Sequence, residues 1–188
     1  MNEDASSRGA RPLAAGTPVH HAIQIRQTNL VDEEFANFYR MHVKILIAFL
    51  IKQNASLNDA ADIAQSSMEK LYGRWGEVEY PKAWVYKVAS RELIRKLVDA
   101  RENPVREVPE SSSLLPGGGM DEWESRHEAM RVLRMLPPRQ RQIMAWTLSD
   151  FTPAEIAEQL NLSCEAVRAS LRKARQAATA LVRKGEEE

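Results

Sequence analysis

The residues with the clearest binding chemistry lie near the carboxyl terminus, where residues 153–172 read PAEIAEQLNLSCEAVRASLR. A helix-turn-helix needs a small residue where its helices cross, a turn residue that tolerates positive φ, and a branched apolar residue that seals the second helix. Ala157, Asn161 and Val167 supply these three. The exposed face of the second helix predicts contact with a DNA major groove through Glu165, Arg168, Ala169, Arg172, Lys173 and Arg175. A plain helical hairpin is the alternative.

A second group of cations lies on the helix predicted from Pro81 to about Asp99. Lys87, Arg91 and Arg95 recur every four residues and share one stripe, apart from the apolar stripe of the same helix. Cations that bind phosphates, together with aromatic rings that stack on bases, are typical of sites for unstacked single strands. Such a site would use Lys82 with Trp75 and Tyr80 of the preceding loop, whereas Trp84 fits a core position better.

Charge is distributed unevenly along the 188 residues, although the formal net charge is zero. Residues 81–101 carry six basic side chains against two acidic ones, and residues 163–184 carry six against one. The intervening residues 102–136 carry seven acidic side chains against four basic ones. Two basic segments separated by an acidic one indicate two nucleic-acid contacts rather than one uniformly basic surface.

These side chains require helices to position them, and the apolar spacing predicts an all-α protein of two small helical domains joined by a flexible linker. In the first domain we expect helices from Asp32, from Asn58 to Tyr72, and from Pro81, with Asp32 and Asn58 as N-caps. In the second domain, Thr152 to Glu155 fits a capping box and Ser163 caps the last helix. The predicted units are a disordered tail (1–28), a first domain (29–101), a linker rich in Pro, Gly and Ser (102–121) and a second domain (122–185).

Several function classes are not expected. We find no nucleophile paired with a base, no phosphate-binding glycine loop and no metal-ligand cluster, so we expect no enzyme, no cofactor and no metal. No apolar run approaches the length of a membrane span, and we expect a cytoplasmic protein without membrane insertion. Cys164, the single cysteine, is interpreted either as a small structural residue or as a thiol sensor at a helix N-terminus.

The segment LPPRQRQIMAWTLSDFTPAEIAEQLNLSCEAVRASLRKAR (136–175) resembles region 4 of the sigma factors of RNA polymerase. ADIAQSSMEKLY (61–72) and PKAWVYKVASREL (81–93) resemble region 2, and the short linker is similar to that of the extracytoplasmic-function (ECF) type. The resemblance implies a −35 reader in the second domain and a −10 reader in the first, with the loop from Gly73 to Tyr80 as the part that captures a flipped base.

The resemblance also implies partners. Asp62, Gln65 and Glu69 would bind the β′ clamp helices of core RNA polymerase, and the chain would further contact the β flap, promoter DNA and an anti-sigma factor. The chain departs from the family pattern at Arg91, where the family often has Asn, and at Ser170, where an arginine often contacts DNA. We therefore expect an unusual −35 preference. A helix-turn-helix regulator that acts without polymerase is the alternative function.

Overall fold

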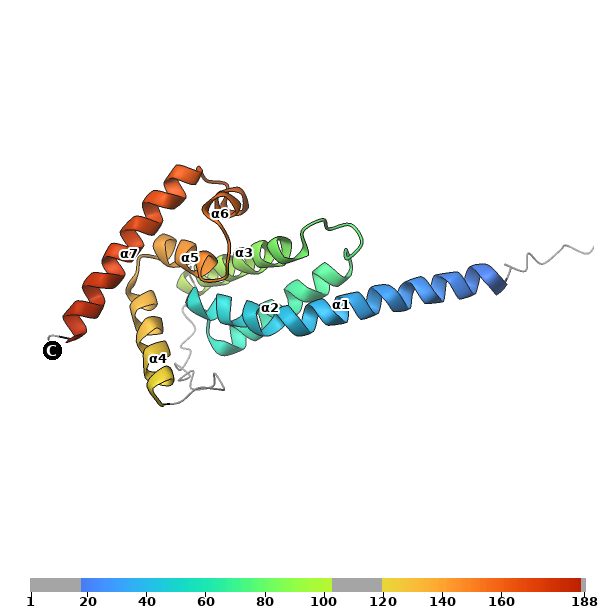
Figure 1. The fold of residues 1–188 in the computed structure, drawn as a ribbon, viewed down its shortest axis with the longest axis horizontal. Helices are drawn as coiled ribbons and strands as arrows, with labels where there is room; N and C mark the ends of the chain where they lie inside the picture. The colour runs from blue at the N-terminus through green and yellow to red at the C-terminus, as the bar shows by residue number, and fades with distance from the viewer. Residues whose placement is uncertain (1–17, 103–119, 187–188) are drawn as a thin grey trace, which may run out of the picture.

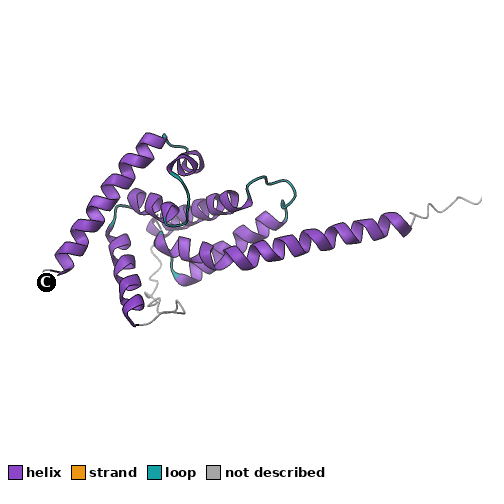
Figure 2. Ribbon diagram, viewed as in Figure 1, coloured by secondary structure: helices purple, strands orange, loops and turns teal. Residues whose placement is uncertain are grey.

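The computed structural model describes the backbone of residues 18–102 and 120–186, and every regular element in these ranges is an α-helix. Three helices form an amino-terminal group and four form a carboxy-terminal group (Figures 1 and 2). In chain order they are α1 (Pro18–Lys52), α2 (Leu57–Tyr72), α3 (Pro81–Glu102), α4 (Met120–Met135), α5 (Pro138–Thr147), α6 (Pro153–Leu160) and α7 (Cys164–Glu186). The expected all-α class with two helical groups is confirmed.

Helix α1 begins earlier than the sequence pattern suggested. We expected a tail to residue 28 and an N-cap at Asp32, but residues 18–28 already belong to α1 and Asp32 lies inside it. The physical reason is that Pro18 suits the first helical position and no Gly or Pro follows before Lys52. Residues 1–17, the rest of the predicted tail, lie outside the described residues.

The amino-terminal group packs α1, α2 and α3 around one another, with Leu46, Phe49, Leu71 and Leu93 fully or almost fully buried. Helix α2 is capped by Ser56, whose hydroxyl accepts a hydrogen bond from the Asp59 amide at 3.1 Å. The predicted cap, Asn58, is already within the helix. The distal end of α1 projects away from the rest of the molecule (Figure 1).

The carboxy-terminal group is built on α5 and α7, which pack against each other and against α4 and α6. Helix α4 ends at Met135 and α5 starts at Pro138, so the chain reverses within two residues. Arg141 stabilises this reversal because its guanidinium donates hydrogen bonds to the carbonyls of Leu133, Arg134 and Leu136 at 2.9–3.1 Å. Carbonyls at the end of a helix lack the usual amide partner of a following turn, although that of Leu133 also accepts from the Leu136 amide at 3.2 Å. The hydrogen bonds of Arg141 to the end of α4 thus explain the last arginine of the LPPRQR segment (136–141).

The two groups are in contact in this structure. A single buried cluster runs from Leu46 and Phe49 of α1 through Tyr86 of α3 to Trp146 of α5 and Ile156 of α6.

In the described parts of the chain, no helix is long and apolar enough to cross a membrane. The predicted linker falls mostly on residues 103–119, outside the described ranges.

Candidate nucleic-acid interface

The turn between α6 and α7 has the geometry of a helix-turn-helix. Thr152 and Glu155 form a complete capping box at the start of α6, in which the Glu155 carboxylate accepts from the Thr152 amide at 2.7 Å. Asn161 ends the helix in the left-handed conformation, with φ 54° and ψ 52°. Ser163 then caps α7 by accepting from the Ala166 amide at 3.1 Å. All of these local features were predicted from the residue types.

The packing that holds α7 against α6 is also as predicted. Val167 is fully buried and Ala157 is 7% exposed, so the small residue lies at the crossing and the branched residue seals it. Ile156 and Leu171 complete this contact. The amide of Leu162 donates to the Ala157 carbonyl at 2.9 Å, which closes the turn. The first turn of α7 is therefore held rigidly on α6.

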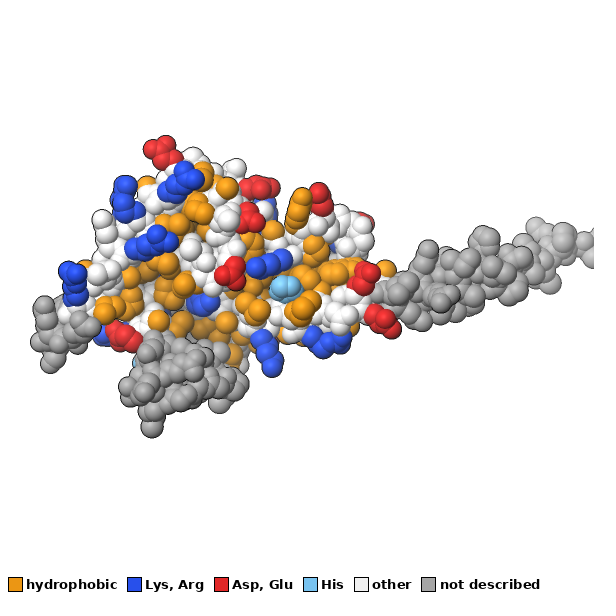
Figure 3. Space-filling model, in the orientation of Figure 1, with side chains coloured by type: hydrophobic (Ala, Val, Ile, Leu, Met, Phe, Trp, Pro, Cys, Tyr) orange, Lys and Arg blue, Asp and Glu red, His pale blue; other side chains and the backbone are white. Residues whose placement is uncertain are grey.

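The cations predicted for the major groove lie on the outer face of α7. Lys and Arg side chains follow the helix along the edge of the molecule in Figure 3. Arg168, Arg172 and Arg175 line a shallow hollow beside Pro153 of α6, together with Leu171 and Gln176. Glu165 and Lys173 are exposed as well, whereas Ala169 is half-buried. The outer face of α7 is thus positively charged and held in a fixed position by α6. A recognition helix that enters the DNA major groove requires both properties.

In the amino-terminal group, α3 carries the second set of predicted contacts. Arg91 and Arg95 are exposed and Lys87 is half-buried. Lys82 differs, because its ammonium lies 4.9 Å from the ring centroid of Phe151, in the loop before α6. It therefore already has an aromatic partner in the carboxy-terminal group.

The aromatic residues of the loop between α2 and α3 divide into two kinds. Tyr80 is 69% exposed and available to a base. Trp75 packs against α1, with its ring centroid 5.2 Å from that of Phe35 and 5.1 Å from that of Phe38. Both are expected to contact bases, and in this structure Trp75 anchors the loop on α1. Trp84, expected in the core, is partly buried against it, and the Arg74 guanidinium lies 5.9 Å from its ring.

The predicted protein-docking residues share one exposed face of α2. Asp62, Gln65 and Glu69 all face outward, at the spacing of successive helical turns. The Gln65 amide donates to the Glu69 carboxylate at 2.8 Å, and the Tyr39 hydroxyl donates to the Gln65 side chain at 3.2 Å. These hydrogen bonds order the polar side chains of Gln65 and Glu69 on the outer face of α2.

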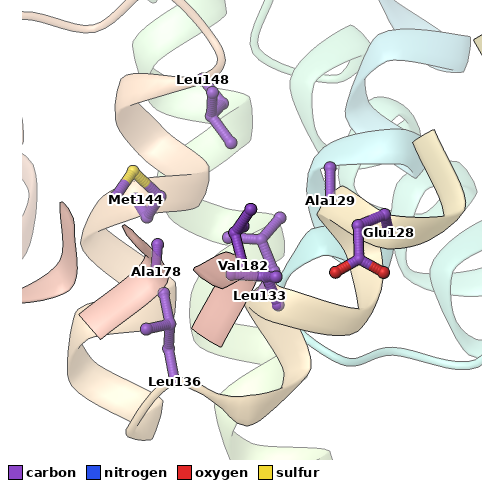
Figure 4. Close-up of a pocket in the computed structure, with 9 residues that line it drawn as sticks. Glu128, Ala129, Leu133, Leu136, Met144, Leu148, Ala178 and Val182 are labelled. Atoms are coloured by element: carbon purple, nitrogen blue, oxygen red, sulfur yellow. The ribbon is translucent and has the colours of Figure 1, made fainter. Parts of the chain in front are cut away.

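An apolar groove of about 440 Å³ separates α4 from α5 and α7. Figure 4 shows the side chains that line it, and the carboxylate of Glu128 lies at its edge. The apolar lining consists of Ala129, Val132, Leu133, Leu136, Met144, Leu148, Ala178 and Val182. Among the described residues, no group of His, Cys, Asp and Glu is arranged to hold a metal ion.

Comparison with known proteins agrees with this geometry. Residues 126–177 match the family "Sigma-70, region 4". The chain is 26% identical over 153 residues to the RNA polymerase sigma-E factor of Streptomyces coelicolor, covering 75% of this chain and 81% of that one.

Two solved structures share the fold. The sigma factor RpoE of Bartonella quintana, in complex with the anti-sigma factor NepR, superimposes with a TM-score of 0.67 and 20% identity over 80% of this chain and 98% of that one. CnrH, in complex with the cytosolic domain of CnrY, gives a TM-score of 0.59 and 16% identity over 81% and 90%. These likenesses concern the arrangement of helices in both groups.

Proposed function

We propose that this chain is a sigma factor of the extracytoplasmic-function type, which docks on core RNA polymerase through α2, reads the −10 element with α3 and reads the −35 element with α7. The observation that carries this assignment is the coincidence of the region 4 match with a fully formed helix-turn-helix whose outer face presents Arg168, Arg172 and Arg175. Catalysis belongs to the polymerase and not to this chain.

For the −35 element, the cations of α7 provide the contacts. Arginine side chains form paired hydrogen bonds with guanine edges and also neutralise phosphates. Ser170 is half-buried, so the position where the family often carries an arginine offers only a hydroxyl here. Recognition therefore depends more strongly on Arg168 and Arg172, and we expect a −35 preference that differs from that of the family.

For the −10 element, the exposed Arg91 and Arg95 attract the backbone of the separated strand, and Tyr80 offers a ring for base stacking. Lys87 lies one turn before Arg91 on the same stripe. Trp75, which packs on α1, and Lys82, which lies beside Phe151, remain in this proposed site. The proposed contact set on this side is thus Trp75, Tyr80, Lys82, Lys87, Arg91 and Arg95.

Polymerase binding is assigned to two surfaces of different chemistry. The polar face of Asp62, Gln65 and Glu69 fits the β′ clamp helices, because acidic and amide groups on a rigid helix suit a hydrogen-bonded, charge-complementary contact. The apolar groove between α4, α5 and α7 fits an apolar segment of the β flap. Once one of the two surfaces has bound the polymerase, the other is held nearby at a high effective concentration. The overall affinity can therefore be high even where each contact alone is weak.

An anti-sigma factor is proposed as a further partner. RpoE is described in its structure as a complex with the anti-sigma factor NepR, and CnrH as a complex with the cytosolic domain of CnrY. A partner of this kind would compete with the polymerase for the same exposed surfaces.

The test is transcription in vitro from genomic fragments with core polymerase, with and without the chain. We expect transcripts with defined 5′ ends only when the chain is present, and their loss when Arg168 and Arg172 are both replaced by alanine. A chain that binds duplex DNA tightly and specifically by itself, and gives core polymerase no new start sites, would instead be a stand-alone regulator.

A further inference from the structure

Ile94 and Val98 lie on the surface of α3, although both side chains are large and apolar. Ile94 is 45% exposed and Val98 is 46% exposed, whereas Ala89, on the opposite side of the helix, is fully buried. The two residues are one helical turn apart, so their side chains are neighbours on the helix surface. A single exposed apolar residue is ordinary, but a pair within a proposed binding face requires an explanation.

This apolar pair continues the face of α3 that carries the predicted cations. Successive residues of an α-helix are rotated by about 100°, so Lys87, Arg91, Ile94 and Val98 point within about 60° of one another. Arg91 is exposed and Lys87 is half-buried, and the exposed Arg95 flanks the same face. The outer face of α3 is therefore cationic in its first part and apolar toward its end.

The other charged side chains of this part of α3 lie away from that face. Glu92 pairs with Lys70 of α2, and Lys96 pairs with Asp59 of α2. Asp99 is exposed at the margin of the face. The outer face thus combines positive charge with apolar surface, and its acidic neighbours lie at its sides.

Such a face suits a separated DNA strand better than a duplex. Cations bind phosphates in both, but the faces of the bases are stacked in a duplex and become accessible only when the strand is unstacked. Ile94 and Val98 lie about 6 Å apart along the helix axis, whereas stacked bases of one strand lie about 3.4 Å apart. Two neighbouring bases can therefore rest on the two side chains only where the strand is extended.

We propose that Ile94 and Val98 contact the faces of unpaired bases of the −10 element and extend the site for the separated strand toward the end of α3. The inference rests on the proposed function, which supplies that strand. The cations on the same face complement phosphates, which favours a DNA strand over an apolar protein segment as the occupant. The cations give a salt-dependent attraction, and the apolar pair adds contact area that does not depend on salt.

The test compares the double variant Ile94→Ala, Val98→Ala with a double variant that carries leucine at the same two sites. Alanine removes the apolar surface and favours the helix, whereas leucine retains the surface. Met41→Ala with Ile45→Ala is the matched control, because these residues are also exposed and one turn apart, on α1. The helical circular dichroism of all three variants should match that of wild type.

Each chain is assembled with core polymerase and titrated against a labelled single strand that carries the −10 element of a promoter mapped by transcription in vitro. The alanine variant should bind this strand at least about tenfold more weakly than wild type, and the leucine variant and the α1 control should stay within about twofold. The slope of log affinity against log salt should not change in the alanine variant. Arg91→Ala should lower that slope by about 0.7, because it removes a phosphate contact.

The outcomes separate this inference from the proposed function. Wild-type affinity of the alanine variant for the strand, or an equal loss in the α1 control, would overturn the inference and leave the proposed function intact. Weaker binding of the alanine variant to core polymerase itself, measured with a labelled chain, would make the face a protein-docking surface and overturn it as well. A wild-type chain that gives core polymerase no start sites would overturn the proposed function, and the inference with it.

Discussion

The side-chain amide of Gln142 in α5 donates a hydrogen bond to the hydroxyl of Ser90 in α3 at 3.2 Å, although 52 residues separate the two along the chain. Ser90 is 2% exposed, and its hydroxyl donates a hydrogen bond to the side-chain oxygen of Gln53 in α1. Three helices from two helical groups are thus joined by two consecutive hydrogen bonds. Since buried polar groups are costly to leave unpaired, these bonds link the stability of the two groups.

Replacing Ser90 by alanine is expected to lower the free energy of unfolding by about 1–3 kcal/mol, because two side-chain amides lose their partner in the interior. Urea denaturation at neutral pH measures this. Ser66→Ala on α2, where the serine is only half-buried, is the control and should cost less than about 0.5 kcal/mol. Equal losses in the two variants would show that the Ser90 hydrogen bonds do not stabilise the chain.

Charge reversal on the outer face of α2 tests polymerase docking. Asp62→Arg should weaken binding to core polymerase by at least about tenfold, equivalent to about 1.4 kcal/mol, with an unchanged unfolding midpoint because the side chain is exposed. Glu33→Arg reverses another exposed negative charge, on α1, and should bind normally. Fluorescence anisotropy of a labelled chain titrated with core enzyme gives both affinities. Normal binding by the Asp62 variant would exclude this face as the docking surface.

The recognition helix is tested by Arg172→Ala. Arg172 faces outward beside Arg168 and Arg175. Its removal should reduce the affinity of the polymerase complex for a promoter fragment, and the slope of log affinity against log salt should fall by about 1 if the arginine neutralises a phosphate. Arg183→Ala, at an exposed site beyond the helix-turn-helix, is the control. The same loss in both variants would mean that α7 contributes only general positive charge.

His42 predicts a pH dependence of stability. Burial, and secondarily the nearby Lys82, lower the pKa of its imidazole below the ordinary value of 6.5. The folded chain therefore keeps His42 neutral while the unfolded chain takes up a proton. Stability is complete above pH 6.5 and is lost as the pH falls from there toward the lowered pKa.

The measurement compares urea denaturation at pH 7.5 and pH 5.5 for wild type and His42→Phe. Phenylalanine can keep the ring contact with Phe38, whose centroid lies 4.3 Å from that of His42, but cannot titrate. Wild type should lose more stability on acidification than the variant does. An identical pH dependence in the two proteins would show that His42 does not contribute.

Local structure could be predicted from residue types wherever neighbouring residues alone determine it. The capping box at Thr152, the left-handed Asn161 and the cap at Ser163 all appear where the sequence placed them. Each depends on a hydrogen bond or a backbone preference within four residues. The true start of α1 was missed because helical periodicity is weak before Asp32, and a helix continues until some residue stops it.

The contact between the two helical groups could not be predicted, because it depends on residues from distant segments. The sequence does not mark Trp146 of α5 or Phe151 of the following loop as contacts between the two groups, since a single buried aromatic is an ordinary core residue. Their partners, Phe49 and Tyr86, lie about 60 to 100 positions earlier in the chain. The same contacts changed the interpretation of Lys82, which was expected to meet DNA and here faces Phe151.

We propose that the chain lends core RNA polymerase its choice of promoter. Footprinting of one promoter fragment with the chain alone, core polymerase alone and the two together measures this choice. We predict protection at the −10 and −35 elements only in the combined sample, lost when Asp62 is replaced by arginine. Equal protection by the chain alone, unchanged by polymerase or by the Asp62 substitution, would contradict the claim.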